Sequence, residues 1–459
     1  MTTHRILILG GGLGGVYAAR RLDQIFAHRD DVEITLLSGE NFLLFTPMLA
    51  EVVSSSIEAS HIISPIRAFF RRGRVRFQNS EVKSIDLERR VVTASHCLMC
   101  GSREFPFDHL VLALGSTTEF HGLPGVAENA LPMKTLGDAM TLRNHIIDVF
   151  EHADMVGDPV LRESMLTFVV AGGGFAGTET VAEVHDFAQT ACRFYSTIKP
   201  SEIKVVLVHS GTRIMPEIGD RLAGYALKKL EASGIEVVLN AQVSSASDAW
   251  VELTGKLLVG ENVAQRTQRR RIATKTLIWS AGVRPHPLLT TLPCGRNRRG
   301  QLITNPYMSV PGYQGLWALG DCGEIPDGDG KLCPPTAQFA LQQGRVIAEN
   351  IASELGIGTR KPFAYRPIGL LASLGRRCAV AEICGFDFSG FFAWWLWRTI
   401  YLLKLPGLER KVRVALDWTL DLFFPRDIVL LKLLMRPSAA GLTAKVNIEA
   451  ETARSIPTF

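Results

Sequence analysis

The sequence has too little cysteine for a scaffold of disulfide bonds, and it has no long uninterrupted apolar run. Its 459 residues include eight cysteines, a proportion typical of proteins whose thiols stay reduced. The longest apolar stretch, Gly390–Leu403, contains Arg398 and is shorter than the roughly 20 residues of a membrane-spanning helix. We therefore predict no spanning helix, no cleaved leader and a reducing, cytoplasmic compartment.

An excess of charge of one sign is also lacking. Fifty basic and 45 acidic residues give a formal net charge of +5, which is too small and too dispersed to favour nucleic acid as a partner. Hydrophobic residues make up 47% of the chain and charged residues 21%, which excludes a disordered or fibrous protein. The length predicts two or three globular domains.

Glycine is abundant, at 41 residues, and two glycine-rich segments of similar pattern lie about one domain apart. They are Arg5–Leu22 (RILILGGGLGGVYAARRL) and Thr167–Val184 (TFVVAGGGFAGTETVAEV). In each, a strand-like run passes through GGGxxG into a helix-compatible segment, the context of a dinucleotide-binding loop. Such glycines form the turn, admit the pyrophosphate and let helix pack on strand. The glycines in these roles are Gly10, Gly12, Gly15, Gly172, Gly174 and Gly177.

A second strand is predicted after each glycine loop, at Val32–Leu37 and at Ile203–Val208. A carboxylate that binds the ribose is expected where such a strand ends. The first strand ends at Ser38, with Glu40 close behind, whereas the second ends at His209 with no acidic residue nearby. A 2′-phosphate tolerates His209 and Arg213 better than a carboxylate, so the choice between NADH and NADPH stays open.

Two further patterns lie in the second half of the chain. The segment Gly315–Cys322 (GLWALGDC) predicts a short buried strand that brings Gly320 and Asp321 into a turn. A proline pair beyond it precedes a helical run in which Gln338 and Gln342 share one face, because they are four residues apart.

The order of these motifs resembles the flavoproteins with two dinucleotide-binding domains, and most closely the type II NADH:quinone oxidoreductases, which are single-subunit, membrane-associated NADH dehydrogenases. The resemblance covers nearly the whole chain. Its more diagnostic segments are Pro334–Gln343 (PPTAQFALQQ), Gly369–Arg376 (GLLASLGR) and the tryptophan-rich tail. The other matching segments are Asn41–Val53, Leu110–Ser116, Gly172–Glu179, Ile278–Val283 and Leu319–Cys322.

This resemblance implies an α/β fold with two Rossmann-like domains, one for FAD and one for NAD(P)H, and a C-terminal amphipathic helical region. It places the FAD domain at residues 1–125 and 291–364, the NAD(P)H domain at 126–290 and the membrane-association region at 365–459. The implied reaction passes a hydride from NADH or NADPH to the flavin and then two electrons to a membrane quinone, without proton pumping.

The resemblance also implies roles for individual residues. Glu179 is expected near the nicotinamide, Gln338 and Gln342 near the isoalloxazine and the quinone headgroup, and Asp321 at the sugar-phosphate part of the flavin. The remaining cofactor-binding residues expected are Gly10, Gly12, Gly15, Ser38, Glu40, Gly115, Gly172, Gly174, Gly177, His209, Gly282, Gly320 and Ala337.

No metal site is expected. Cys97 and Cys100 form a C-x-x-C pair, but a structural zinc site needs four ligands and the sequence has no second such pair. We predict a surface hairpin with two reduced thiols.

Two alternative functions stay open. A sulfide:quinone oxidoreductase requires cysteines at the flavin, for which Cys333 is a candidate and Cys192 a poorer one. A flavoprotein that uses bound nucleotide as a redox signal, as apoptosis-inducing factor suggests, would form a long-lived nucleotide complex and turn over negligibly.

The tail from Gly390 to Leu431 interleaves aromatic and basic residues. It carries four of the seven tryptophans, namely Trp394, Trp395, Trp397 and Trp418. This composition suits the interfacial layer of a bilayer. We expect one helix that ends near Pro406 and another from Leu408 to about Phe424, both flat on the cytoplasmic face of the cell membrane. A dimer interface, or packing on the flavin domain, is the alternative, and a homodimer is expected by analogy.

Overall fold

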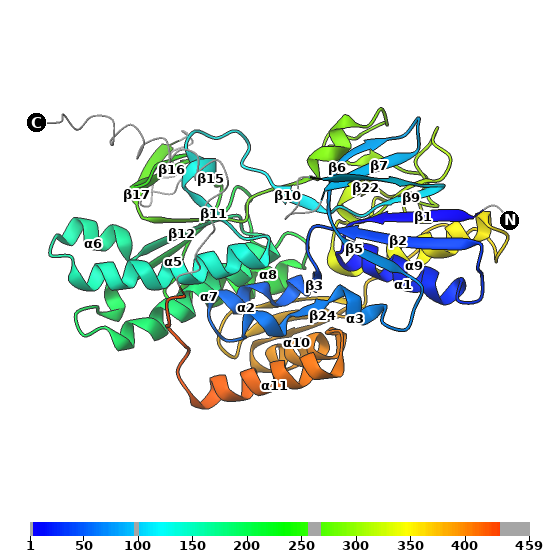
Figure 1. Cartoon of the computed structure of the whole chain (residues 1–459). Helices are drawn as coiled ribbons and strands as arrows, with labels where there is room; N and C mark the ends of the chain where they lie inside the picture. The colour runs from blue at the N-terminus through cyan, green and yellow to red at the C-terminus, as the bar shows by residue number, and fades with distance from the viewer. Residues whose placement is uncertain (1–2, 96–100, 256–267, 432–459) are drawn as a thin grey trace, which may run out of the picture. The chain divides into compact units, whose positions relative to one another are not determined.

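The computed structural model describes residues 3–95, 101–255 and 268–431, and two parallel sheets form the framework of this part of the chain (Figure 1). The first sheet has five strands in the order β21-β9-β1-β2-β5. These strands are β1 (His4–Leu9), β2 (Val32–Ser38), β5 (Arg76–Asn79), β9 (His109–Leu112) and β21 (Leu316–Ala318). Helices α1 (Leu13–Ile25) and α9 (Ala337–Glu354) pack against each other on this sheet.

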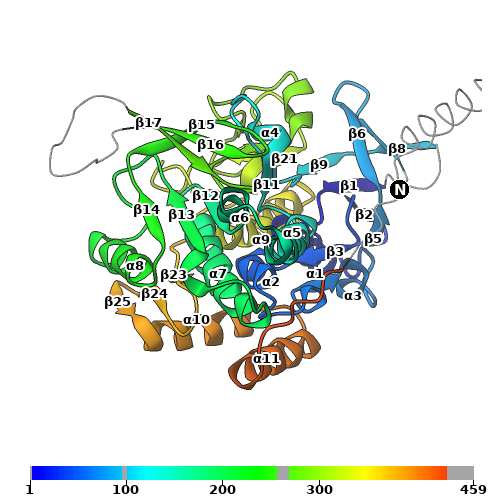
Figure 2. The same ribbon diagram turned by 90° about the vertical axis from the view of Figure 1, so that its left-hand side faces the viewer.

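The second sheet repeats this design with five strands in the order β11-β18-β12-β13-β14. They are β11 (Ala130–Pro132), β12 (Thr167–Ala171), β13 (Lys204–Val208), β14 (Glu236–Val238) and β18 (Thr276–Trp279). The longer helices here are α5 (Leu136–Met155), α7 (Phe175–Ala191) and α8 (Asp220–Ala232), which Figure 2 shows beside the sheet. The predicted α/β class with two Rossmann-like sheets is confirmed, and the predicted strands after both glycine loops are present. The domain limits stay predictions.

Shorter elements complete the framework. Two antiparallel sheets consist of β6 (Glu81–Asp86), β7 (Val91–Ser95) and β8 (Ser102–Pro106), and of β15 (Ala241–Ala246), β16 (Trp250–Gly255) and β17 (Gln268–Ala273). Three two-stranded pairs are β3 (Phe42–Leu44) with β4 (Ile63–Pro65), β10 (Ser116–Thr118) with β19 (Val283–Pro285), and β20 (Leu302–Ile303) with β22 (Gly323–Glu324). The short helices are α2 (Leu49–Val53), α3 (Ile66–Phe69), α4 (Val126–Asn129) and α6 (Pro159–Met165).

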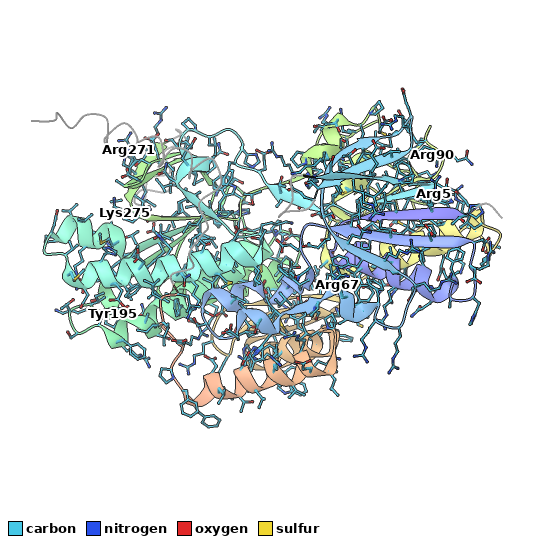
Figure 3. All side chains as sticks on the ribbon, in the orientation of Figure 1. Arg5, Arg67, Arg90, Tyr195, Arg271 and Lys275 are labelled. Atoms are coloured by element: carbon cyan, nitrogen blue, oxygen red, sulfur yellow. The ribbon has the colours of Figure 1, made fainter. Side chains whose placement is uncertain are left out.

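The first sheet is covered on both faces, as parallel sheets usually are. Along β1, Ile6 and Ile8 join the apolar core on the side of α1 and α9. Leu7 and Leu9 join the core on the opposite face, because successive side chains of a strand alternate. Arg5, labelled in Figure 3, forms a 2.9 Å ion pair with an Asp108 carboxylate oxygen and joins the starts of β1 and β9.

The C-terminal region forms a small sheet followed by two helices. The sheet contains β23 (Gly369–Ser373), β24 (Ala379–Ile383) and β25 (Phe386–Ser389), and the helices are α10 (Gly390–Lys404) and α11 (Leu408–Phe423). Both helices have the predicted limits, since Pro406 and Gly407 separate them and Gly407 adopts φ +84. Within the described ranges, every helix is too short or too polar to cross a bilayer.

The sequence predicts that the four tryptophans of the tail lie at the surface, in the interfacial layer of a bilayer. This prediction is wrong for three of them. Trp394, Trp397 and Trp418 are only 9%, 1% and 5% exposed, whereas Trp395 is 51% exposed. The buried rings pack inside the region: the Trp397 and Trp418 centroids are 6.1 Å apart, and the Arg398 guanidinium lies 4.1 Å from the Trp394 ring. A tryptophan buries more apolar area than any other side chain, so α10 and α11 use it to pack on the rest of the protein.

Candidate active site

The first glycine loop joins β1 to α1 and combines close packing with one open position. Gly10 has φ +114, and a Cβ atom there would lie 2.1 Å from the Ala113 carbonyl oxygen. A Cβ on Gly15 would lie 2.0 Å from the Gly10 oxygen, whereas no atom lies within 4 Å of a Cβ on Gly12. Gly12 caps the N-terminus of α1. The backbone therefore offers an open helix N-terminus that fits a pyrophosphate group.

The second loop, between β12 and α7, has the same geometry. Gly172 has φ +105, and a Cβ on Gly177 would lie 1.8 Å from the Gly172 carbonyl oxygen. Gly174 caps α7, and a Cβ on this glycine would have no other atom within 4 Å. Both loops therefore fit a dinucleotide.

At the end of β2, Ser38 lies under the first loop. A Cβ on Gly11 would lie 2.5 Å from the Ser38 hydroxyl oxygen, and this oxygen accepts a hydrogen bond from the Glu40 N–H at 3.3 Å. The Glu40 side chain is exposed. Ser38 thus packs against the loop, and Glu40 is the carboxylate that is accessible to a ribose.

At the end of β13, His209 binds the second loop through its ring. The Gly173 N–H donates to His209 Nδ1 at 3.1 Å, and burial lowers the pKa of this histidine. The nearby Arg213 pairs with Asp220 and donates to the Pro216 carbonyl oxygen. Both side chains therefore have partners within the protein. The sequence alone suggested that they could accept a 2′-phosphate, and these contacts weaken that suggestion.

Asp321 follows β21 and belongs to a three-residue polar group. The Ser116 hydroxyl donates to Asp321 Oδ2 at 2.5 Å, and Lys134 Nζ donates to the same hydroxyl at 2.7 Å. Lys134 also lies 3.5 Å from the carboxylate. Ser116 and Lys134 were missed by the sequence reasoning. Lys134 directly precedes Thr135, whose capping box with Asp138 begins α5. The sequence around Lys134 therefore signals the start of a helix and gives no sign of a contact with Asp321.

Helix α9 brings amides to the same end of the first sheet. Gln343 is buried, and its Oε1 accepts a hydrogen bond from the Gly320 N–H at 2.8 Å. Gln338 and Gln342 are half-buried, and Ala337 begins the helix. Gln343 holds the turn before Asp321, a role that the sequence pattern of Gln338 and Gln342 did not reveal.

Gly115 and Gly282 lie just beyond β9 and β18, at the carboxyl edges where open α/β sheets bind ligands. Gly115 has φ +72 with no atom within 4 Å of its Cβ position. The Gly282 carbonyl oxygen accepts a hydrogen bond from the Glu119 N–H at 3.1 Å. Gly115 therefore leaves space at the first sheet, and Gly282 is fixed by the strand pair β10–β19.

Glu179 lies on α7, just beyond the second glycine loop. Its Oε1 accepts a hydrogen bond from the Ser373 N–H of β23 at 3.0 Å, and burial raises its pKa to about 8. The two motifs around Gly172 and Gly369 are therefore in direct contact. A carboxyl group with such a pKa holds its proton at pH 7, as a general acid must.

The cysteines considered for a sulfide enzyme lie in different parts of the fold. Cys192 is buried at the end of α7, where its thiol contacts the Gln189 carbonyl oxygen. Cys333 packs against the core beside α1 and α9, and burial raises its pKa to about 11. Neither thiol has the low pKa of a reactive cysteine. Cys97 and Cys100 lie outside the described residues.

Two parallel sheets, each with a glycine loop at a helix N-terminus, define a flavoprotein oxidoreductase with two dinucleotide sites. The family model described as pyridine nucleotide-disulphide oxidoreductase matches residues 4–344, and the NDH2 C-terminal domain matches residues 368–427. The type II NADH:quinone oxidoreductase NdhA of Mycobacterium tuberculosis is 33% identical over 90% of this chain and 86% of that protein. This chain therefore belongs to the family of type II NADH:quinone oxidoreductases.

Solved structures agree on the fold. NDH2 from Plasmodium falciparum in complex with NADH has a TM-score of 0.84 at 19% identity and covers 93% of this chain and 100% of that chain. The sulfide:quinone oxidoreductase of Aquifex aeolicus has a lower TM-score of 0.67, at 16% identity, over 92% and 96% of the two chains. The predicted family and enzyme class are confirmed, and with them the predicted pair of cofactors, FAD and a nicotinamide dinucleotide. The individual site residues stay predictions.

Proposed function

We propose that this protein oxidises NADH through bound FAD and delivers two electrons to a quinone. The observation that carries the proposal is the repeated loop geometry, with open positions at Gly12 and Gly174. FAD, when bound at the first loop, would supply the hydride acceptor for the nicotinamide and the electron donor for the quinone. The protein's own residues bind the two pyrophosphates at the N-termini of α1 and α7.

The side chains around these loops orient the cofactors and supply protons. Asp321 would bind the sugar-phosphate part of FAD, and its contacts with Ser116 and Lys134, which fix the carboxylate, support this role. Glu179 holds a proton close to the second loop. Gln338 and Gln342 can hydrogen-bond a quinone carbonyl without ionising, because an amide does not titrate.

We also propose that α10 and α11 hold the protein on the cytoplasmic face of a membrane as a peripheral protein. Exposed apolar side chains run along both helices, namely Phe391, Phe392, Trp395, Leu403, Leu408, Val412, Leu416, Leu420 and Phe423. Arg410, Lys411 and Arg413 lie among them and can meet anionic lipid. The homodimer remains a further proposal, and the molecular mass in solution tests it.

The test is anaerobic bleaching of the flavin band of the purified protein by NADH, NADPH or sulfide, each added alone, followed by reoxidation with a soluble quinone. We expect rapid bleaching by NADH and recovery with quinone. Bleaching by sulfide alone would contradict the proposal and assign the chemistry to the cysteines. A long-lived reduced complex that quinone does not reoxidise would instead indicate a nucleotide-sensing protein.

A further inference from the structure

A cavity of about 370 Å³ lies between the end of α7 and the end of α11 (Figure 2). This volume is within the range of pockets that hold small ligands, about 300–1,000 Å³. Its walls come from α7, from the short helix η3 (Cys192–Phe194), from the turn between β23 and β24, and from the chain around the end of α11. Elements distant in the sequence therefore enclose one space, which none of the predicted site residues lines.

Guanidinium groups outnumber carboxyl groups around this cavity. Three arginines and two aspartates line it, and the adjoining cavity of about 10 Å³ adds two arginines and two glutamates. The excess of positive charge favours an anionic ligand. The arginines are Arg193, Arg376, Arg377, Arg398 and Arg426, and the acidic residues are Glu51, Glu183, Asp186 and Asp421.

The carboxylates of the larger cavity already have partners within the protein. Asp186 Oδ2 accepts a hydrogen bond from the Arg376 N–H at 2.5 Å. Asp421 Oδ1 accepts a hydrogen bond from Arg426 Nε at 3.1 Å. Arg426 is buried and also lies 3.4 Å from Glu183 Oε2. These groups stabilise the walls of the cavity, so a ligand must be bound by other side chains.

Arg193 and Arg376 are the free cations at this cavity. Both side chains are exposed, and within the described ranges neither guanidinium group makes a hydrogen bond or an ion pair. Gln189 and Thr190 also line the cavity, but their side chains donate to backbone carbonyl oxygens. A guanidinium group presents a planar fork of N–H donors that matches the oxygens of a phosphate. The cavity therefore offers two donors for one phosphate group.

The turn that carries Arg376 is fixed against α7. Gly375 has φ +86, and a Cβ atom there would lie 2.7 Å from Asp186 Oδ2. The same carboxylate oxygen binds the Arg376 N–H. The backbone of Arg376 is therefore held at the cavity before a ligand arrives, and binding needs to order only the side chain.

The rim of the cavity is apolar and continues the outer face of α11. Phe423 and Phe424 line the cavity and are 78% and 63% exposed. Leu416, Leu420 and Phe423 follow the helical period and are all exposed. A phospholipid combines an anionic phosphate with acyl chains, so free arginines beside exposed aromatic rings suit the boundary between its headgroup and its chains. A free phosphate ion would contact the arginines and leave the rim unused.

We propose that this cavity binds the phosphate group of an acidic phospholipid through Arg193 and Arg376, while Phe423 and Phe424 contact its acyl chains. The inference rests on the proposed membrane association through α10 and α11. It adds a site for a single lipid molecule to the general attraction between basic residues and an anionic surface. The two differ in a measurable way, because a site saturates at a fixed stoichiometry and diffuse attraction does not.

The first test titrates dihexanoyl-phosphatidylglycerol, below its micelle concentration, into the holoenzyme and follows the heat of binding. We expect saturation at one lipid per chain, and binding weaker on the order of 10-fold in the double variant Arg193→Gln, Arg376→Gln. The matched control is Arg298→Gln, Arg299→Gln, which removes two exposed arginines before β20 and should bind as the wild type does. Equal binding by the two double variants, or no saturable binding by the wild type, would overturn the proposal.

Inorganic phosphate, titrated alone, separates the two sources of the anion. We expect it to bind more weakly than the short-chain lipid on the order of 10-fold, because it makes no apolar contact with the rim. Equal affinities would overturn the assignment to a lipid and indicate a site for free phosphate. Gln189→Trp keeps every charge but narrows the cavity, so it should weaken the binding of the lipid. Unchanged lipid binding in this variant would show that the lipid does not enter the cavity.

Vesicles distinguish this proposal from the proposed membrane role. We expect vesicles of equal parts phosphatidylcholine and phosphatidylglycerol to bind the wild type more tightly than pure phosphatidylcholine, and Arg193→Gln, Arg376→Gln to lose most of this preference. Leu416→Glu, Leu420→Glu should lose the binding to vesicles and keep the binding of the short-chain lipid. Absence of vesicle binding by the wild type would contradict the membrane role, whereas an unchanged lipid preference in Arg193→Gln, Arg376→Gln would contradict the lipid site.

Discussion

Gly12 and Gly15 serve different physical purposes, although one motif contains both. Gly15 is required by the fold, because a Cβ atom there would lie 2.0 Å from the Gly10 carbonyl oxygen. No atom lies within 4 Å of a Cβ on Gly12, so packing does not require glycine there and the space is open to a ligand. The same contrast separates Gly177 from Gly174 in the second loop. The motif assigns these two roles by position, and the distances separate the glycines of both loops in the same way.

We predict that Gly12→Ala folds but loses FAD, because the added methyl group occupies the approach of the pyrophosphate. Gly15→Ala should lower the melting temperature of the apoprotein, since its Cβ would lie 2.0 Å from the Gly10 oxygen. The measurements are the flavin-to-protein ratio and thermal unfolding. Gly174→Ala is the matched control and should keep FAD while slowing bleaching by NADH. Full FAD content in Gly12→Ala would show that α1 does not bind the pyrophosphate.

Glu179, which we propose as an acid close to the nicotinamide, also accepts a hydrogen bond from the Ser373 N–H. We predict that Glu179→Gln lowers quinone-dependent turnover at pH 7 on the order of 10²-fold, the usual contribution of a general acid. The amide keeps the acceptor for the Ser373 N–H, so the FAD content and the melting temperature should be retained. Steady-state kinetics check this, with the exposed Glu128→Gln as control. Equal turnover in the two variants would exclude Glu179 as the acid.

At the scale of the element, α11 has two separate faces. Val414 and Trp418 pack inward and are 0% and 5% exposed, whereas Leu416 and Leu420 point outward and are 56% and 54% exposed. This division follows the helical period. The inward face carries the contact with Glu51, and the outward face is free for lipid. One helix therefore presents an apolar surface on one side and a hydrogen bond to the buried Glu51 on the other.

We predict that the double variant Leu416→Glu, Leu420→Glu binds anionic vesicles on the order of 10²-fold more weakly, because two apolar side chains no longer enter the bilayer. Turnover with a soluble quinone should be unchanged. Vesicle co-sedimentation measures the binding. The matched control places glutamate at Met155 and Val160, which are 78% and 70% exposed on α5 and α6. Equal loss in both double variants would show that general hydrophobicity, and not α11, governs binding.

At the scale of the whole molecule, two carboxyl groups with raised pKa values connect pH to stability. The pKa values of Glu51 and Glu179 rise from 4.5 to about 8 on folding. Both groups therefore hold protons in the folded state that the unfolded chain releases. Their contribution to stability is complete below about pH 4.5 and is lost as the pH rises to about 8.

We therefore predict that the free energy of unfolding contains a term that falls between these two pH values, and that Glu51→Gln makes the fall smaller. An amide remains neutral at every pH, so the variant should gain stability relative to the wild type as the pH rises. Denaturant unfolding across this range measures the effect, with Glu128→Gln as the exposed control. A steeper fall in Glu51→Gln would contradict the raised pKa.

The sequence by itself determined the elements and their order. The two GGGxxG loops, the strands beside them and the breaks at Pro406 and Gly407 depend on local backbone conformation and on patterns of a few residues, which adjacent positions encode. It also indicated the family and both cofactors, because motif order is a linear property. The tertiary structure decided what depends on residues distant in the chain. It joined Ser116, Lys134 and Asp321, engaged His209 with the second loop, and buried Trp397 and Trp418. It also enclosed Glu51 with Glu183, because burial and the pKa of a carboxyl group depend on every element packed around it.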